Sequence, residues 1–231
     1  MRDVADVERR WRQAEARFES NGYRGPAEAP EFEVRTASRL GMVCAIHAVK
    51  PWRTGRLKGE DQGTGGLATA LAEWLGWSSV VVLRDDPTVE DPNSSEAHPI
   101  KQYLAEQDLP RPGGLLVDLH GMTFRRDLDI SIGIGSNDGA SERLASAVAS
   151  ELILAGFDVD LGAEKTGLRA RSPGTMTSWA QRRNVAAIQV EIAPQWRSRI
   201  ASRTDRQALL NALHAGLAAA ERLTGRRDGP S

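Results

Sequence analysis

The chain has 231 residues, of which 40% are hydrophobic and 26% are charged, and its formal net charge at pH 7 is −1. This composition is typical of a globular protein with a substantial core, and the charge gives no indication of binding to nucleic acid or an anionic membrane. The single cysteine, Cys44, excludes a disulfide within the chain and a cysteine-based zinc site. No apolar run is long enough to span a membrane, and the charged N-terminus is unlike a secretory signal, so we expect a cytoplasmic protein.

Helical periodicity and short apolar runs alternate along the chain. In chain order they predict a helix over 4–19, strands over 32–35 and 42–49, a helix over 67–75, a strand over 78–83, a helix over 100–107, strands over 115–121 and 129–134, a helix over 141–155, a strand over 157–161, a helix over 177–183, a strand over 185–192 and a helix over 204–224. The Gly-, Lys- and Arg-rich segment 50–66 is expected to be irregular, and Ser141 is expected to cap its helix.

This alternation predicts a three-layer α/β sandwich with a mostly parallel or mixed central sheet. We find no internal repeat and no linker, so residues 1–231 are expected to form one domain. Residues 1–30 would contribute an N-terminal helix and loop, and residues 225–231 a flexible tail.

The run 115–121, LLVDLHG, carries the first chemical motif. Three apolar residues lead into Asp118 and His120, and Gly121 lets the backbone turn sharply out of the strand. Because side chains alternate along a strand, Asp118 and His120 lie on the same face. The carboxyl ends of strands are where open α/β sheets place their ligands, so the motif predicts a site at this edge.

Two further apolar runs end in residues of the same kind. His47 closes the run that begins at Met42, and Glu191 closes the run that begins at Val185. Three strand ends therefore offer a His, an Asp-x-His and a Glu. Zinc in hydrolases is typically held by two histidines and one carboxylate, which leaves a position for water.

This pattern predicts a Zn²⁺ site and assigns a role to each residue. His47 and His120 would be the nitrogen ligands, and Asp61 or Glu60, from the segment after His47, would be the oxygen ligand. Glu191 is expected to be the general base that accepts the proton of the attacking water. Asp118 would accept a hydrogen bond from a ligand histidine.

Taken in order, the motifs resemble the N-formylglutamate amidohydrolase family of zinc carboxypeptidase-like hydrolases. The match runs from about residue 42 to residue 192 through HAVK, RLKGEDQGTGGLA, DPN, LVDLHGM, DISIG and IQVEI. Lys50 stands where the carboxypeptidase H-x-x-E motif has its Glu, so the carboxylate ligand must come from later in the chain. The resemblance favours Asp61, which best matches the family's Asp before Thr-Gly, and Glu60 stays an alternative. It implies zinc-dependent hydrolysis of an amide bond next to a carboxylate-bearing group.

That implied substrate, a small molecule, suits the basic loops. Arg binds carboxylates through two parallel hydrogen bonds, and Arg171 is the residue that we expect to do so. Asn93 follows Asp91 where the family has an Asn near the site, and it would orient the substrate. Two alternatives remain, a zinc carboxypeptidase or peptidoglycan-type amidase, and a non-catalytic binding protein of the same fold. His98 is expected to be a solvated loop residue, and His214 a structural or surface residue.

Overall fold

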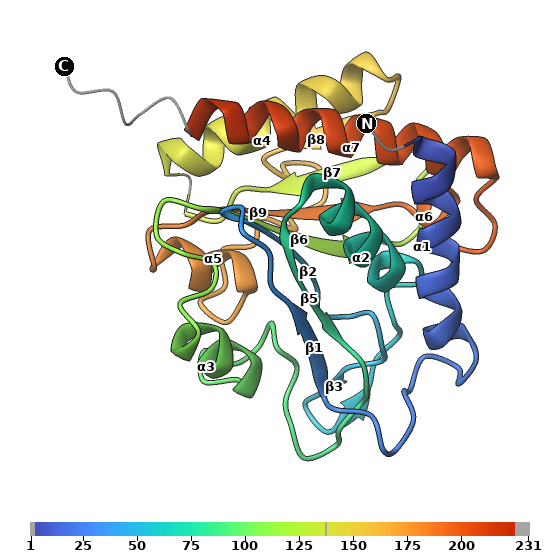
Figure 1. The fold of residues 1–231 in the computed structure, drawn as a ribbon, viewed down its shortest axis with the longest axis vertical. Helices are drawn as coiled ribbons and strands as arrows, with labels where there is room; N and C mark the ends of the chain where they lie inside the picture. The colour runs from blue at the N-terminus through green and yellow to red at the C-terminus, as the bar shows by residue number, and fades with distance from the viewer. Residues whose placement is uncertain (1–2, 137, 225–231) are drawn as a thin grey trace.

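The computed structural model describes residues 3–136 and 138–224 and contains a central seven-stranded mixed sheet between two layers of helices (Figure 1). The strands are β1 (Phe32–Arg35), β2 (Gly41–Ala45), β5 (Ser78–Val82), β6 (Leu115–Gly121), β7 (Ile130–Gly133), β8 (Val159–Leu161) and β9 (Ala186–Ile192), in the spatial order β1-β5-β2-β6-β9-β7-β8. β3 (Trp52–Arg53) and β4 (Arg56–Leu57) form a separate hairpin.

The helices are α1 (Val4–Glu19), α2 (Thr64–Leu75), α3 (Pro99–Glu106), α4 (Gly139–Leu154), α5 (Met176–Gln181), α6 (Pro194–Arg197) and α7 (Arg203–Thr224). α1, α2, α4 and α7 form one layer, while α3 and α5 lie on the other side of the sheet (Figure 1). Apolar residues of the strands pack against these layers in one large hydrophobic cluster, apart from the exposed Leu161 of β8. The predicted α/β sandwich with a mixed sheet is therefore confirmed.

Four neighbouring strands, β5, β2, β6 and β9, run parallel, so their carboxyl ends meet at one edge of the sheet. β1 and β7 are antiparallel to their neighbours, and β8 is parallel to β7. The register places His120 of β6 beside Glu191 of β9, and Asp118 beside Cys44 of β2. The topology thus brings the predicted strand-end residues together at the carboxyl ends of the central strands.

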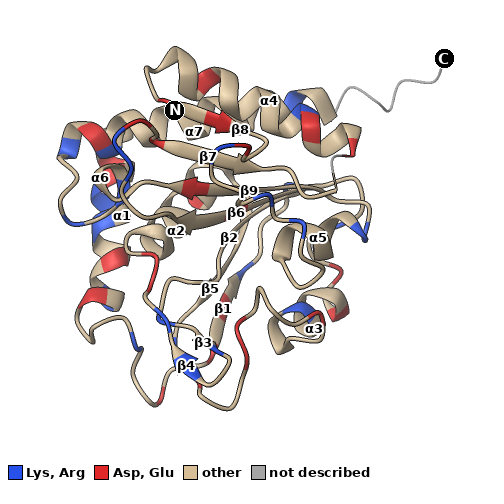
Figure 2. Cartoon of the chain, turned by 180° about the vertical axis from the view of Figure 1, so that it is seen from behind, with Lys and Arg blue, Asp and Glu red and all other residues tan. Residues whose placement is uncertain are grey.

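Charged residues of both signs are spread over the helices and loops, with few in the strands (Figure 2). Within the described ranges, no helix combines the length and the apolar character that crossing a membrane requires.

Several predicted elements differ from the structure. Segment 50–66 is not irregular throughout, because it contains the β3–β4 hairpin and the first residues of α2. β2 is shorter than the predicted strand over 42–49, and His47 lies in the turn that follows it. α6, a single turn that begins at Pro194, was not predicted.

The cap of α4 also differs. Asp138, not Ser141, is the N-cap, since its Oδ1 accepts hydrogen bonds from the backbone N–H groups of Ala140 and Ser141. Ser141 is buried inside the first turn, where its hydroxyl donates to Asp138 and accepts from the backbone N–H of Ala187. The predicted tail over 225–231 lies outside the described residues.

Candidate metal centre

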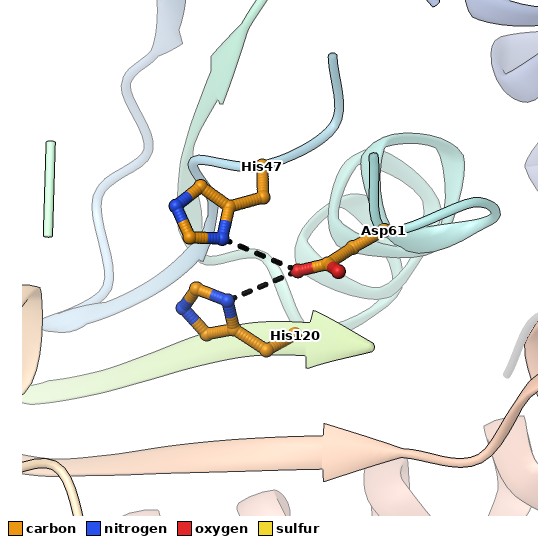
Figure 3. A group of neighbouring side chains, drawn as sticks. All are labelled: His47, Asp61 and His120. Carbon is orange, nitrogen blue, oxygen red and sulfur yellow. Dashed lines mark hydrogen bonds and ion pairs between the residues drawn. The ribbon is translucent and has the colours of Figure 1, made fainter. Parts of the chain in front are cut away.

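His47, Asp61 and His120 come together at the carboxyl edge of the sheet (Figure 3). His47 follows β2, His120 is the penultimate residue of β6, and Asp61 precedes α2. Oδ2 of Asp61 lies 3.4 Å from Nδ1 of His47 and 3.1 Å from Nδ1 of His120. One potential ligand atom from each residue lies within 4.8 Å of the other two, which is close enough for all three to hold one metal ion.

Glu60 does not join this group. Its carboxylate accepts a hydrogen bond of 2.8 Å from Nε2 of Gln62 and lies 3.9 Å from Nζ of Lys50. Asp61 faces the histidines, and its backbone N–H donates to the carbonyl of His47 at 2.9 Å. Of the two adjacent acids that the sequence left open, only Asp61 is placed beside the histidines.

The second nitrogen of each histidine faces a buried carboxylate. Nε2 of His47 lies 2.9 Å from Oδ1 of Asp91, and Nε2 of His120 lies 3.0 Å from Oδ2 of Asp118. Asp91 is 1% exposed and Asp118 is 0% exposed. A carboxylate that accepts the Nε2–H proton fixes the tautomer and leaves the lone pair on Nδ1, the atom that faces Asp61. The predicted contact of Asp118 with one of the two histidines, His120, is present.

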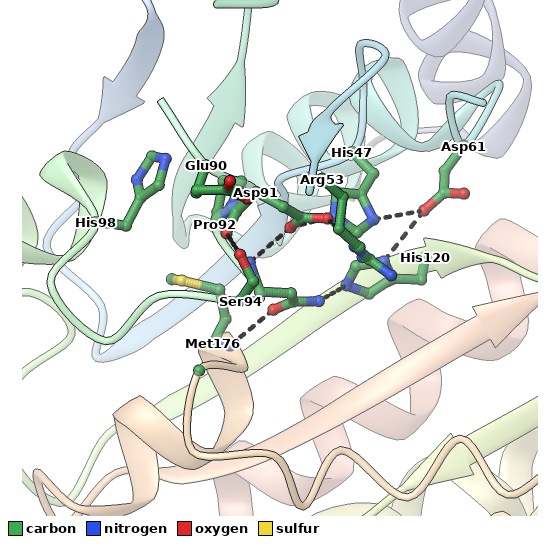
Figure 4. Close-up of polar contacts among 12 residues, drawn as sticks. His47, Arg53, Asp61, Glu90, Asp91, Pro92, Ser94, His98, His120 and Met176 are labelled. Atoms are coloured by element: carbon green, nitrogen blue, oxygen red, sulfur yellow. Dashed lines mark hydrogen bonds and ion pairs between the residues drawn. The ribbon is translucent and has the colours of Figure 1, made fainter. Parts of the chain in front are cut away.

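Asp91 is a site residue that the sequence analysis missed, although the DPN motif contains it. Its Oδ2 accepts a hydrogen bond of 2.8 Å from Nε of Arg53, so it lies between Arg53 and His47 (Figure 4). Its Oδ1 also accepts the backbone N–H of Asn93 at 2.7 Å. These contacts fix the carboxylate in place, so the loop that carries Asp91 holds the ring of His47 in one orientation.

Asn93 makes two contacts that connect separate elements. Its Nδ2 lies 3.2 Å from Nε2 of His120, and its Oδ1 accepts the backbone N–H of Met176, the first residue of α5, at 3.0 Å. Both ends of the amide therefore face protein atoms. The role that we expected for Asn93, orienting the substrate, stays a prediction.

The charges of the group favour a bound cation. Burial alone would lower the pKa of His47, but its hydrogen bonds to Asp61 and Asp91 outweigh burial and raise that pKa to about 9. Burial opposes ionisation of Asp61, yet its hydrogen bonds to His120 and His47 hold the pKa of its carboxyl well below the ordinary value. Without a metal, the acids thus stabilise protons on the histidines, and a metal cation would take the place of that positive charge.

Glu191 lies beside this group on β9. It is buried, and burial raises the pKa of its carboxyl above the ordinary value. Its Oε1 accepts a hydrogen bond of 2.7 Å from Nε2 of Gln189, while Oε2 has no hydrogen-bond partner in the described part of the chain. One oxygen of a positioned carboxylate is therefore free to accept a proton.

A pocket of about 1060 Å³ is lined by both histidines, Asp61 and Glu191. Five basic residues contribute to its wall: Arg53, Lys58, Arg125, Arg169 and Arg171. Arg53 pairs with Asp91 and Arg169 pairs with Glu164. Lys58, Arg125 and Arg171 have no carboxylate partner among the residues that the structure describes. Arg171 is exposed, and its Nε donates to the carbonyl of Gly135 at 3.2 Å.

The donor set fits zinc. Two imidazole nitrogens and one carboxylate oxygen are the ligands that hydrolytic zinc sites use most often. The environment fits as well, because Oδ1 of Asp118 is buried without a hydrogen-bond partner in the described part of the chain, while its Oδ2 lies 3.0 Å from Nε2 of His120. His47, Asp61 and His120 are thus the residues that would hold the ion.

The other two histidines lie outside the group. We expected His98 to be solvated, but it is buried. It is the N-cap of α3, where its Nδ1 accepts the backbone N–H of Ile100 at 3.1 Å. The expectation was wrong because proximity to Pro99 suggested an open loop, whereas the proline is the first residue of the helix. His214 stacks on Trp74 with 4.0 Å between ring centroids, which agrees with the structural alternative.

Neither a model of a known protein family nor a curated protein matches the sequence. Solved structures do match the fold. A bacteriophage poly-gamma-glutamate hydrolase has a TM-score of 0.58 at 15% identity over 88% of this chain and 95% of that chain. The zinc-free apo form of YndL has a TM-score of 0.56 at 18% identity over 83% of this chain and 92% of that chain. N-formylglutamate amidohydrolase from Ralstonia eutropha JMP134 has a TM-score of 0.56 at 14% identity over 84% of this chain and 98% of that chain. The chain shares the α/β sandwich fold of these proteins.

Proposed function

We propose that the protein is a zinc-dependent amidohydrolase that cleaves the amide bond of an N-acyl amino acid or a similar small carboxylate-bearing amide. One observation carries the proposal. The Nδ1 atoms of His47 and His120 converge with Asp61 on a pocket that also contains Glu191, while Asp91 and Asp118 face the two Nε2 atoms. This is the arrangement of ligands, orienting carboxylates and candidate base that metal-assisted hydrolysis requires.

The fold supports the same chemistry. Two of the similar structures are hydrolases of amide bonds, one of N-formylglutamate and one of poly-gamma-glutamate, and a third was obtained free of zinc. Both named substrates carry a carboxylate beside the amide that is cleaved. The basic wall of the pocket in this chain suits a substrate of that charge.

Each residue then has a task. Zinc held by His47, Asp61 and His120 would lower the pKa of a water molecule from 15.7 to about 7. Oε2 of Glu191 accepts the proton of the attacking water and returns it to the leaving nitrogen. Asp91 and Asp118 hold the histidine rings with Nδ1 directed at the ion. Arg171 is the residue that we assign to the carboxylate of the substrate.

The size of the pocket favours a second candidate substrate. At about 1060 Å³ it reaches the upper end of the usual range for small-molecule pockets, about 300–1,000 Å³. A peptide-like amide, as for a zinc carboxypeptidase or an amidase, would fill more of it than a formyl amino acid. The same zinc, base and basic residues would act on either substrate.

Metal analysis followed by a substrate screen tests the proposal. We expect about one zinc per chain in the purified protein and none above background in His120→Ala. The screen compares N-acyl amino acids with acidic, neutral and basic side chains, and then short acidic peptides. Full zinc content in His120→Ala would contradict the site. A zinc-bound wild-type protein without activity on any of these amides would favour the non-catalytic binding protein.

A further inference from the structure

Arg197, the last residue of α6, is a buried cation with an unusual set of partners. It is 6% exposed, yet within the described ranges it forms no ion pair with a carboxylate. A buried charge is costly unless the surrounding groups compensate it, and buried arginines are normally paired. The negative charges of Asp61, Glu191 and Glu15 act on it from a distance, while its hydrogen bonds go to main-chain carbonyls, so these acceptors indicate what the side chain does.

Three segments of the chain supply those carbonyls. Nη1 donates to the carbonyl of Gln62 at 2.5 Å, Nε to that of Ile192 at 2.8 Å, and Nη2 to that of Met122 at 3.3 Å. Gln62 directly follows Asp61, and Ile192 directly follows Glu191. Met122 follows His120 by two positions. One guanidinium thus joins the three backbone segments that carry one predicted oxygen ligand, one predicted nitrogen ligand and the predicted base.

Two glycines leave the space that this contact needs. A Cβ atom added at Gly121 would lie 2.0 Å from Nη2 of Arg197, and one added at Gly63 would lie 2.0 Å from its carbonyl oxygen. Gly121 directly follows His120, and Gly63 comes two residues after Asp61. The backbone on both sides of the site is therefore shaped to fit against Arg197.

We propose that Arg197 is a positioning residue that sets Asp61, His120 and Glu191 relative to one another, and so raises the affinity of the site for zinc. The planar guanidinium presents its N–H donors in fixed directions, so three carbonyls bound to it cannot move independently. A site held in this way binds its metal without first having to order its ligands. The inference rests on the proposed zinc site and extends it to a residue that would not itself touch the ion.

The test is the dissociation constant for Zn²⁺, measured by competition with a chromophoric chelator on the full chain. Arg197→Met removes the donors at similar side-chain length, and Arg197→Lys keeps a cation that cannot reproduce the planar fork. Loss of groups that support metal ligands typically weakens metal binding about 10- to 100-fold, and we expect a loss of this size for Arg197→Met. Arg197→Lys should fold more readily and recover part of the affinity.

Arg206 provides the matched control. It is also largely buried, with a side chain 12% exposed, and it donates to Glu8 at 2.7 Å and to the carbonyl of Ala201 at 2.6 Å. These partners lie on α1 and before α7, away from the residues that line the pocket. Arg206→Met should lower the melting temperature while leaving the dissociation constant for Zn²⁺ unchanged.

The outcomes separate this inference from the proposed function. If the wild-type chain binds zinc and both Arg197 variants bind it within about twofold of wild type, the positioning role is overturned and the zinc site stands. The positioning role is also overturned if Arg206→Met weakens zinc binding as much as Arg197→Met does, because the loss of affinity then follows from lower stability alone. If the wild-type chain binds no zinc, the proposed function and this inference are both wrong.

Discussion

The adjacent acids Glu60 and Asp61 show how single hydrogen bonds decide which side chain enters the site. The backbone N–H of Asp61 donates to His47, and its carbonyl accepts from the backbone N–H of Thr64 at 3.1 Å and from the hydroxyl of Thr64 at 2.7 Å. With both backbone groups held, the side chain of Asp61 lies beside the two histidines. Glu60 is left to pair with Gln62 and Lys50 at the margin of the group.

This arrangement predicts opposite effects for two conservative substitutions. Asp61→Asn removes the one carboxylate that the described residues place beside Nδ1 of both His47 and His120, so it should lose zinc. Glu60→Gln should retain about one zinc per chain, because its carboxylate faces other groups. Elemental analysis of both purified variants measures the difference. Zinc loss confined to Glu60→Gln would transfer the ligand role to Glu60.

Glu191 allows a second prediction at this scale. Its carboxylate is placed beside the predicted ligands without joining them, so Glu191→Gln should keep zinc and the fold. General-base catalysis contributes about a hundred- to ten-thousand-fold, and kcat should fall by that factor with a much smaller change in KM. The measurement is steady-state kinetics on a substrate found in the screen, with Glu60→Gln as an isosteric control that keeps its kcat. Loss of zinc from Glu191→Gln would make Glu191 a ligand instead.

Among the secondary structure elements, the start of α2 depends on α1. The buried carboxylate of Glu15 accepts the backbone N–H groups of Gly63 and Gly66, each at 2.7 Å, and Nε1 of Trp11 donates to the carbonyl of Gly63 at 2.8 Å. Side chains of α1 thus satisfy N–H groups that the first turn of a helix leaves free. Because Asp61 lies three residues before Thr64, the first residue of α2, the packing of α1 on α2 also holds the candidate ligand loop.

Gly66 is the position at which this packing can be tested. A Cβ atom there would lie 2.6 Å from the carbonyl oxygen of Trp11 and 2.8 Å from the backbone nitrogen of Glu15. Gly66→Ala should therefore lower the free energy of unfolding by about 1–3 kcal/mol, even though Ala has the higher helix propensity by about 1 kcal/mol. Gly59→Ala is the control, since nothing lies within 4 Å of its added Cβ. Urea denaturation compares the two, and equal stabilities would show that α1 can move aside.

On the scale of the whole molecule, the order of strands creates the site. β2, β6 and β9 are parallel neighbours, so the ends of three segments distant in the sequence meet at one edge. The loop between β5, the parallel neighbour of β2, and α3 then supplies Asp91 and Asn93. The site is therefore assembled by the central parallel strands and not by any one segment of the chain.

The stability of the whole protein should depend on pH through His98. Burial lowers the pKa of His98 to about 4 in the folded state, against an ordinary value of 6.5. Between these values the unfolded chain binds the proton and the folded chain does not, so the stabilising contribution is complete above pH 6.5 and is lost as the pH falls toward 4. From pH 7 to pH 5 this one group should lower the free energy of unfolding by about 2 kcal/mol.

His98→Asn isolates that contribution. Asn is also a favoured N-cap, so it can accept the N–H of Ile100 without titrating. The free energy of unfolding of the variant should decrease less between pH 7 and pH 5 than that of wild type, by about 2 kcal/mol. Denaturation curves at both values measure this, and parallel pH profiles would mean that folded His98 accepts a proton as readily as unfolded His98.

The sequence by itself determined the α/β architecture and most of the candidate site. Apolar periodicity located the strands, and a polar residue at the end of an apolar run needs no distant information to be recognised as a strand-end group. His47, Asp118, His120 and Glu191 were found in this way. Parallel strands in one sheet share a carboxyl edge, so local patterns were enough to predict that these four residues lie together.

Only the tertiary structure decided the rest. Glu60 and Asp61 have the same local pattern, and the hydrogen bond from Asp61 to His47 distinguishes them. Asp91 meets a histidine 44 positions away, and Arg197 binds carbonyls 75 and 135 positions away. Such contacts join loops without hydrophobic periodicity, and their partners depend on how the finished sheet places the loop ends. The resemblance favoured Asp61 over Glu60, and the structure shows that Asp61 lies beside both histidines. The contact of Asp91 with His47 and the arginine behind the site were visible only once the chain was folded.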